Sequence, residues 1–231
     1  AEALIRWQHP EQGLLAPGQF LPDIENHAIS IDIGEMVIAK ALAQIDNWQQ
    51  QNISLPVSVN IGAIQIQQSG FPTQLENILK LYPNVSPDLL MLEVLETSAI
   101  GDVLSASKIM QQCSTLGVRF AIDDFGTGYS SLTYLRHLPV SLIKIDQTFI
   151  RDILDDPSDM AIVNSVITLA KAFNKNVIAE GVETIAHGTA LLELDCQLAQ
   201  GYGIAKPMPG ENIIPWMQTW VPDTAWLDKK S

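Results

Sequence analysis

The sequence predicts an α/β protein of the TIM-like (β/α)8 barrel class. Short apolar runs alternate along the chain with longer segments of helical period, which is the order of elements in a parallel sheet covered by helices. The apolar runs are almost uninterrupted, as in strands that are buried on both faces. A length of 231 residues also suits a barrel, which typically takes about 250 residues.

Seven segments are predicted to be strands, one fewer than a closed barrel needs. We therefore expect a further strand upstream of Ala1, and a seven-stranded open sheet is the structural alternative. The seven predicted strands are Ala3–Trp7, Pro56–Asn60, Leu89–Leu95, Val118–Ile122, Leu142–Ile145, Asn176–Ala179 and a weaker one at Leu198–Tyr202.

Between the strands, apolar residues recur every three to four positions, which predicts amphipathic helices. This spacing is clearest in residues 33–48, 103–116 and 160–173. Gly117 stands where a helix C-cap is expected, and Ser158 is predicted to be the N-cap of the third helix.

The composition excludes several classes of protein. Because 13 basic residues face 26 acidic ones, the formal charge is −13, and a broad surface for duplex nucleic acid, which needs clustered Lys and Arg, is not expected. No run approaches the ~20 apolar residues of a membrane-spanning helix. The two cysteines, Cys113 and Cys196, indicate no disulfide framework and fit a reducing compartment.

The chemistry is expected at the strand ends, because each apolar run finishes in a polar residue that the stability of a sheet does not require. The carboxyl ends of parallel strands meet at one rim of a barrel, where barrel active sites lie. Asp123 and Asp124 are expected to follow the strand that ends at Ile122, and Glu2 and Arg6 are expected on one face of the first strand. The polar residues at strand ends are Ser58, Asn60, Glu93, Glu96, Asp123, Asp124, Lys144, Asp146, Glu180 and Gln200.

Carboxylates gathered at one rim repel one another unless cations separate them. Oxygen ligands without a His or Cys cluster favour Mg²⁺, Mn²⁺ or Ca²⁺ over Zn²⁺, and the four His residues show no zinc-binding pairing. Two adjacent aspartates can bind separate metals, and two metals about 3.5–4 Å apart can activate water for an in-line displacement at phosphorus. The residues alone therefore favour phosphodiester hydrolysis.

A series of short motifs runs through almost the whole chain in a fixed order. The motifs are Glu2-Ala3-Leu4-Ile5-Arg6-Trp7 with His9-Pro10, Val57-Ser58-Val59-Asn60, Leu92-Glu93-Val94-Leu95-Glu96, Ala121-Ile122-Asp123-Asp124-Phe125-Gly126, Ile143-Lys144-Ile145-Asp146, Ala179-Glu180-Gly181-Val182-Glu183-Thr184 and Gln200-Gly201-Tyr202. Any one of them is weak, but the series is specific. With these motifs the sequence resembles the EAL-domain family of cyclic di-GMP phosphodiesterases.

The resemblance implies a barrel whose first strand runs antiparallel to the others, upstream of Ala1. It implies hydrolysis of one phosphodiester bond of 3′,5′-cyclic di-GMP to linear 5′-pGpG, with two ions of Mg²⁺ or Mn²⁺ and with Ca²⁺ as an inhibitor. In the positions that match the family, Glu180 and Lys144 assist a metal-activated water. The matching metal ligands are Glu2, Asn60, Glu93, Asp123 and Asp124, and the matching substrate-binding residues are Arg6, Leu4, Asp146 and Gln200.

The resemblance also implies the setting of the domain. Residues 1–222 correspond to an N-terminally truncated EAL phosphodiesterase domain, and residues 223–231 to a C-terminal tail. Residues 125–138 match a loop and short helix linked to metal binding and to dimerisation, and Glu96 matches the glutamate that anchors this loop. We therefore expect a homodimer, an upstream sensor or cyclase-like domain, and action in the cytoplasm, either free or tethered to a membrane sensor.

Three positions depart from the family pattern. Leu95 stands where many members have Thr, Gln147 where Arg is frequent, and Asp195 where Gly is common. None of them removes an implied metal ligand. Two alternatives stay open: a non-catalytic receptor that relays cyclic di-GMP occupancy to an attached domain, which only Leu95 favours, and a metal-dependent barrel enzyme that acts on another phosphoester or on an enolisable substrate.

Overall fold

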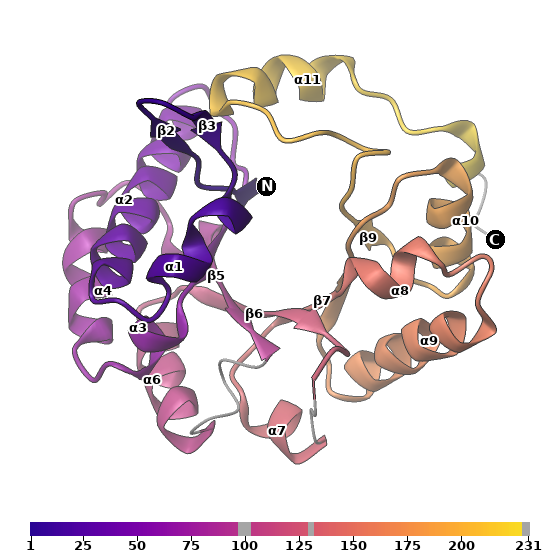
Figure 1. The fold of residues 1–231 in the computed structure, drawn as a ribbon, viewed down its shortest axis with the longest axis horizontal. Helices are drawn as coiled ribbons and strands as arrows, with labels where there is room; N and C mark the ends of the chain where they lie inside the picture. The colour runs from indigo at the N-terminus through magenta and orange to yellow at the C-terminus, as the bar shows by residue number, and fades with distance from the viewer. Residues whose placement is uncertain (97–102, 129–131, 228–231) are drawn as a thin grey trace. The chain divides into compact units, whose positions relative to one another are not determined.

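The structure is a computed structural model that describes residues 1–96, 103–128 and 132–227. It confirms an α/β fold in which helices accompany a parallel sheet (Figure 1). The strands are β1 (Glu2–Ala3), β2 (Trp7–His9), β3 (Gly13–Leu15), β4 (Val57–Ile61), β5 (Leu90–Leu95), β6 (Arg119–Phe125), β7 (Leu142–Ile145), β8 (Asn176–Ala179) and β9 (Leu198–Ala199).

Helices connect these strands. The α-helices are α1 (Leu21–Ile24), α2 (Ile29–Gln49), α3 (Ala63–Gln67), α4 (Phe71–Lys80), α6 (Val103–Thr115), α7 (Leu132–His137), α8 (Gln147–Arg151), α9 (Pro157–Ala172), α10 (Ile185–Glu193) and α11 (Ile213–Thr219). Short 3₁₀ turns are η1 (Pro17–Gln19), η2 (Pro87–Leu89), η3 (Gly210–Asn212) and η4 (Thr224–Trp226). No helix among the residues described here combines the length and the apolar character needed to cross a membrane.

The sheet has the strand order β1-β4-β5-β6-β7-β8-β9, and β2 and β3 form a separate pair. The chain divides into two compact units. The first comprises Ala1–Ile122 with Ser130–Val140, and the second comprises Asp123–Tyr129 with Ser141–Ser231.

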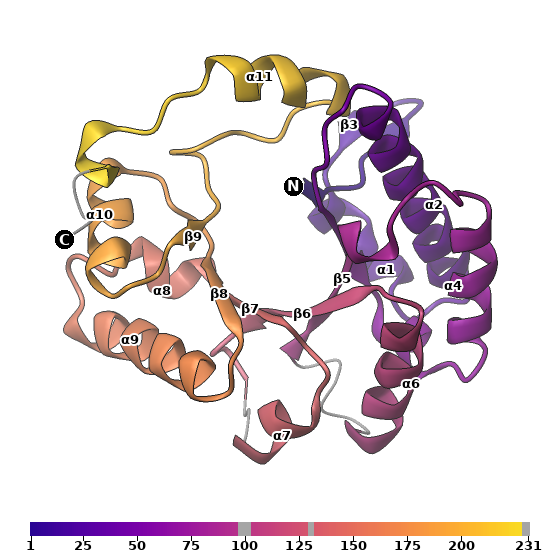
Figure 2. The same ribbon diagram turned by 180° about the vertical axis from the view of Figure 1, so that it is seen from behind.

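In the first unit, β4 pairs in parallel with β1 on one side and with β5 on the other. Helix α2 packs against β4, α3 and α4, Figure 2 shows it beside α4, and its Ile38, Leu42 and Ile45 are fully buried. These residues follow the three-to-four spacing that predicted the helix. Burial of this apolar face fixes β4, which carries Asn60, and β4 in turn pairs with β5, which carries Glu93.

In the second unit, β8 pairs in parallel with β7 and β9. Helix α9 packs along β7 and β8 and also contacts α8. Its inner face buries Val163, Ile167 and Ala170. The turn η4 packs against α10, while residues 228–231 of the predicted tail lie outside the described ranges.

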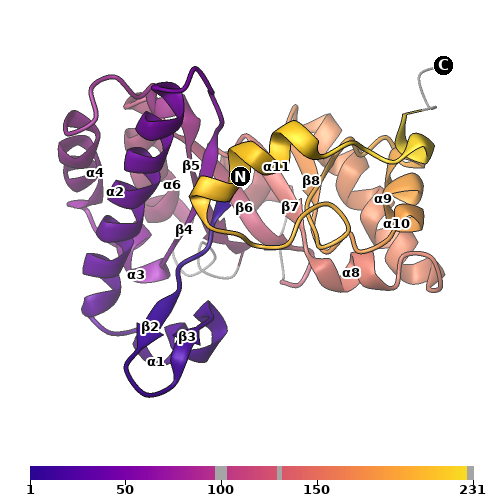
Figure 3. The ribbon, with the colours of Figure 1, turned by 90° about the horizontal axis from the view of Figure 1, so that it is seen from above.

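The predicted strand Ala3–Trp7 is wrong. Strand β1 ends at Ala3, and Trp7 instead begins a hairpin with Gly13–Leu15 that stands with α1 at one end of the first unit (Figure 3). Its turn is held by His9 Nδ1, which accepts the N–H groups of the two residues at the tip, and the Trp7 ring packs edge-on against Phe20. Trp7 thus belongs to a local hairpin and not to the first strand of the sheet, which ends at Ala3. Glu2 and Arg6 therefore do not share a strand face.

The predicted N-cap at Ser158 is also wrong. Helix α9 begins with Pro157, which suits a first helical position because its missing N–H has no partner there. The cap is Asp156, whose Oδ1 accepts the N–H of Ser158 at 2.7 Å. The predicted C-terminal signal at Gly117 is confirmed, since Gly117 has a φ of +99° two residues after the end of α6 at Thr115.

Two strand boundaries differ where polar residues stand. Strand β6 continues past Ile122 to Phe125 and therefore includes Asp123 and Asp124, which were expected to follow it. Strand β9 ends at Ala199, before Gln200. Strands β7 and β8 have the predicted bounds.

Candidate active site

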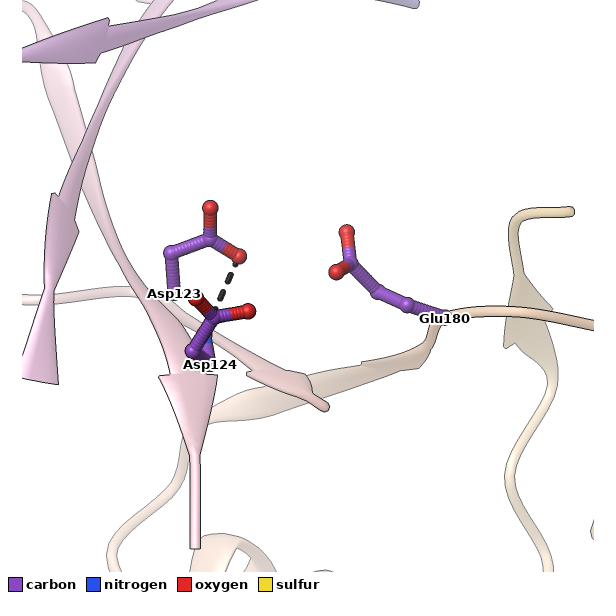
Figure 4. A group of neighbouring side chains, drawn as sticks. All are labelled: Asp123, Asp124 and Glu180. Atoms are coloured by element: carbon purple, nitrogen blue, oxygen red, sulfur yellow. Dashed lines mark hydrogen bonds between the residues drawn. The ribbon is translucent and has the colours of Figure 1, made fainter. Parts of the chain in front are cut away.

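The centre of the site is a pair of aspartates at the end of β6. Successive strand residues normally point to opposite faces, but Asp124 has a left-handed φ of +54°, which breaks this alternation. The Asp124 N–H donates to Asp123 Oδ1 at 3.1 Å, and the Asp124 carbonyl accepts the Thr127 hydroxyl at 2.8 Å. The two neighbouring carboxylates therefore lie together (Figure 4).

Glu180 is the third acid of the cluster and directly follows strand β8. Its N–H donates to the Ile145 carbonyl at 3.1 Å. Glu180 points toward the two aspartates (Figure 4), and one carboxylate oxygen from each of the three residues lies within 4.8 Å of the others. The prediction that these three acids converge is confirmed.

Lys144 is the cation of the cluster. Its side chain is 2% exposed, and its Nζ lies 2.9 Å from Asp123 Oδ1 and 2.7 Å from Glu180 Oε1. A lysine is almost never buried without a charged partner. The two ion pairs account for its burial in β7 and fix the spacing between Asp123 and Glu180.

Asp146 joins the cluster as the N-cap of α8. Its Oδ1 accepts the N–H of Thr148 at 2.8 Å and also the Thr148 hydroxyl, and its charge acts on the nearby Asp124 carboxyl. Burial acts to raise the pKa of Asp146, but the two bonds from Thr148, together with the interactions with Asp124 and Arg151, outweigh burial and hold that pKa below its usual value. Asp146 therefore stays ionised.

Burial and the crowding of acidic groups raise the pKa of Asp124. Its partial burial, followed by repulsion from Asp123 and by the hydrogen bond and charge of Asp146, raises its pKa from 3.8 to about 7. Lys144 opposes this rise without cancelling it. This carboxyl is therefore partly protonated near pH 7, and a divalent cation would have to displace the proton in order to bind it.

The donor set fits a hard divalent metal. Three carboxyl groups lie within ligand distance of one another, and the buried Lys144 ammonium group pairs with two of them, so the acidic groups outnumber the basic one. A divalent cation relieves this imbalance, and oxygen donors suit Mg²⁺, Mn²⁺ or Ca²⁺. The residues that would hold it are Asp123, Asp124 and Glu180.

Three further predicted metal ligands lie together in the first unit. Asn60 Nδ2 donates to Glu2 Oε1 at 2.9 Å, and Asn60 stands opposite Glu93 in the β4–β5 register. Glu93 is 2% exposed. Their common role with Asp123 as ligands of one metal stays a prediction.

The remaining predicted residues are the substrate-binding candidates Leu4, Arg6 and Gln200 and the loop anchor Glu96. Leu4 is 38% exposed, and Arg6 Nη1 donates to the carbonyls of Leu4 and Ile5. Gln200 follows β9, where its main chain bonds Ala179 and Val182. Glu96 is buried at the end of β5, and residues 129–131 of the loop that it is predicted to anchor lie outside the described ranges. The roles of these four side chains stay predictions.

The contact between Thr148 and Asp146 was not predicted from the sequence. The available signal was the pattern Asp-x-Ser/Thr, because an aspartate at a helix start commonly accepts bonds from the residue two positions later.

A parallel sheet with these acids at its strand ends defines an α/β domain able to hold a divalent metal. The family model described as "EAL domain" matches residues 1–207. The chain therefore belongs to the EAL-domain family. The resemblance stated from the motifs is confirmed.

Curated relatives are longer than this chain. It is 41% identical over 214 residues to the bifunctional diguanylate cyclase/cyclic di-GMP phosphodiesterase MucR of Pseudomonas aeruginosa, covering 92% of this chain and 31% of that protein. It is 36% identical over 220 residues to the cyclic di-GMP phosphodiesterase PdeR of Escherichia coli K12, covering 95% and 33%. The chain thus spans about a third of the length of these relatives.

Solved structures share the fold. The PaMucR phosphodiesterase in complex with c-di-GMP superposes with a TM-score of 0.88 at 41% identity, covering 92% of this chain and 86% of that one. The EAL domain of Mycobacterium smegmatis DcpA gives a TM-score of 0.76 at 31% identity, covering 90% and 89%. These similarities confirm the predicted fold class.

Proposed function

We propose that this chain hydrolyses one phosphodiester bond of 3′,5′-cyclic di-GMP to linear 5′-pGpG in a reaction that depends on Mg²⁺ or Mn²⁺. The observation that carries the proposal is the clustering of Asp123, Asp124 and Glu180 around the buried Lys144. The substrate is suggested by the relatives named above as cyclic di-GMP phosphodiesterases and by the similar structure with c-di-GMP.

The reaction adds water across a P–O3′ bond. The oxygen of water bonds to phosphorus, the P–O3′ bond breaks, and the product keeps a 5′-phosphate and a free 3′-hydroxyl. When bound, divalent metals would supply the activation of water and the neutralisation of charge at phosphorus. Glu93, Asn60 and Glu2 are proposed as further ligands.

Side chains of the protein are proposed to accept the proton, position the water and bind the substrate. Glu180 is proposed to accept a proton from the attacking water, and Lys144, 2.7 Å from Glu180 Oε1, is proposed to hold that water in place. Arg6 is proposed to bind the substrate phosphate, with Leu4, Asp146 and Gln200 as further substrate contacts.

The test is product analysis after incubation of the chain with cyclic di-GMP and Mg²⁺. We expect pGpG in samples with Mg²⁺ or Mn²⁺ and none in samples with EDTA or with Ca²⁺ alone. Glu180→Gln should lower kcat by about 10²-fold or more, since a general base contributes roughly 10²–10⁴-fold. Glu183→Gln is the matched control, because Glu183 is an exposed glutamate of the same loop.

Three outcomes would contradict the proposal. Tight binding of cyclic di-GMP without product would favour the receptor alternative. Turnover of another phosphoester in a substrate panel, with cyclic di-GMP left intact, would favour the other barrel enzyme. Full activity of Glu180→Gln would remove Glu180 from the reaction.

The setting of the domain forms part of the proposal. We infer dimerisation through residues 125–138, an upstream sensor or cyclase-like domain, and action in the cytoplasm. The length of the relatives supports a further domain, and one relative is named as a bifunctional cyclase and phosphodiesterase. Sedimentation of the chain with and without an Arg136→Glu substitution in α7 tests the dimer, which should dissociate in the variant.

A further inference from the structure

We propose that Gly203 is a positioning residue for Glu180, and that it acts by keeping a β-bulge at Glu180 and Gly181 in place. The bulge aims the carboxylate that the proposed reaction uses as its base, and a side chain at position 203 would displace it. This inference rests on the proposed function, because it assumes that Glu180 accepts a proton from the attacking water.

The bulge lies where the pairing of β8 and β9 continues beyond the ends of the two strands. Ala179 is paired with Ala199, so a regular parallel ladder would place Gln200 opposite Glu180. The Gln200 N–H donates to the Ala179 carbonyl at 2.8 Å, as in such a ladder. The Gln200 carbonyl, however, accepts the N–H of Val182 at 3.0 Å, one residue later than a regular ladder requires. Glu180 and the residue after it therefore stand opposite one residue, which defines a bulge.

The extra residue is Gly181, whose left-handed φ of +76° turns the chain directly after Glu180. On the other side Glu180 keeps the regular pairing with β7, because its N–H donates to the Ile145 carbonyl at 3.1 Å. Its carboxylate lies 2.7 Å from Lys144 Nζ and points toward the two aspartates (Figure 4). Bulges beside active sites commonly aim a side chain in this way.

Gly203 holds the far end of the bulge. Its N–H donates to the Val182 carbonyl at 2.9 Å, so the N–H and the carbonyl of Val182 are both bonded to the segment that follows β9. A Cβ at position 203 would lie 2.8 Å from the backbone carbonyl carbon and oxygen of Glu183 and 3.0 Å from the Val182 carbonyl oxygen. Because these neighbours are backbone atoms, a side chain at position 203 would push away the loop that begins at Glu180.

The loop is also fixed from its inner side, because the side chain of Val182 is fully buried. The backbone bonds and this burial together set the position of Glu180 relative to Lys144. Such fixation matters for a base, since a displacement of about 1 Å at a reacting group can lower a rate about 10²-fold.

The test measures kcat and KM for cyclic di-GMP with Mg²⁺ in the 231-residue chain and in its Gly203→Ala variant. We expect kcat to fall at least about tenfold because Glu180 is displaced, while KM changes less than about threefold. In a Glu180→Gln background the same substitution should change kcat less than about twofold, since a residue that acts only through Glu180 then has nothing left to position. A purely structural role would lower kcat by the same factor in both backgrounds.

Gly188→Ala is the matched control, because it adds the same methyl group at a crowded position of the same unit, 2.5 Å from Trp226 Nε1. It should lower the melting temperature and leave kcat and KM at the parent values at a temperature where the variant is folded. If Gly203→Ala fails to fold, Val182→Ala takes its place. This variant loosens the same loop without adding bulk, and its loss of kcat should likewise disappear in the Glu180→Gln background.

Parent-like kcat in a folded Gly203→Ala chain, or in Val182→Ala where that variant replaces it, would overturn this inference and leave the proposed function intact. Equal losses of kcat in the parent and Glu180→Gln backgrounds would also overturn it, because Gly203 would then act on something other than Glu180. A parent chain that does not hydrolyse cyclic di-GMP would overturn the proposed function and this inference with it.

Discussion

Lys144 and Glu180 form an ion pair of 2.7 Å across the neighbouring strands β7 and β8. The register places Lys144 opposite Ile178, and residues two apart in a strand share a face. Glu180 therefore follows β8 on the side that Lys144 occupies. The pairing of the two strands, rather than chance rotamers, brings the ammonium and carboxylate groups together.

Lys144→Met should destabilise the folded chain. The substitution leaves Asp123 and Glu180 without their shared cation, and breaking a buried ion pair typically costs about 3–5 kcal/mol. Urea denaturation of the metal-free protein at pH 7 measures the effect. Lys171→Met provides the comparison, because Lys171 pairs with Asp195 on the exposed surface, where a pair contributes about 0–1 kcal/mol. Equal losses in the two variants would contradict the role given to Lys144.

Asp124→Asn should change how stability depends on pH. The folded chain holds the pKa of Asp124 at about 7 against 3.8 in the unfolded chain, so the folded state binds the proton more tightly. The stability from this proton is complete below about pH 4 and is lost as the pH rises to about 7. In EDTA, the parent chain should therefore lose roughly 1–2 kcal/mol more than Asp124→Asn between pH 4 and pH 8, a figure reduced for the partial exposure of the group.

Denaturation midpoints at pH 4, 6 and 8 check this prediction. Mn²⁺ should reverse the loss at pH 8 in the parent chain but not in Asp124→Asn, because the ion competes with the proton for the same carboxylate. Parallel pH profiles for the two proteins would show that Asp124 does not titrate as described.

Gly181→Ala should destabilise the chain by about 2 kcal/mol or more. The added Cβ would meet Gln147 at 2.6 Å, and the φ of +76° is unfavourable for any L side chain. Gly18→Ala is the control, since a Cβ there meets nothing within 4 Å and φ lies outside the left-handed region. Thermal melting of both variants measures the difference, and an unchanged melting temperature for Gly181→Ala would refute the close contact with α8.

Gly188→Ala should also destabilise the chain, although alanine normally favours a helix by about 1 kcal/mol over glycine. Trp226 packs on this face of α10, its Nε1 donates to the Ile185 carbonyl at 3.0 Å, and a Cβ at position 188 would lie 2.5 Å from Nε1. In a Trp226→Ala background the same change should become stabilising. A double-mutant cycle tests this reversal, and the same sign in both backgrounds would mean that the indole does not sit against Gly188.

The sequence predicted the members of the acidic cluster because the carboxyl ends of parallel strands converge. Asp123, Lys144 and Glu180 each stand at the end of an apolar run that is easy to recognise. The left-handed backbone of Asp124 could not be predicted, because its φ depends on the turn stabilised by Thr127.

Other features depended on competition between local structures. The segment from Ala3 to Trp7 has the composition of a strand, yet Trp7 pairs with Leu15 in the hairpin. This local pairing is favoured because a short turn closes at little entropic cost. The contact of Thr148 with Asp146 was not predicted because helix-capping patterns are common, and the sequence does not show which of them lies beside the site.

The most direct test of the central claim is anomalous X-ray diffraction from crystals of the chain soaked with MnCl₂. The account predicts an anomalous peak within about 2.5 Å of carboxylate oxygens from Asp123 and Asp124. Well-ordered Asp123, Asp124 and Glu180 side chains with no manganese peak among them would contradict it.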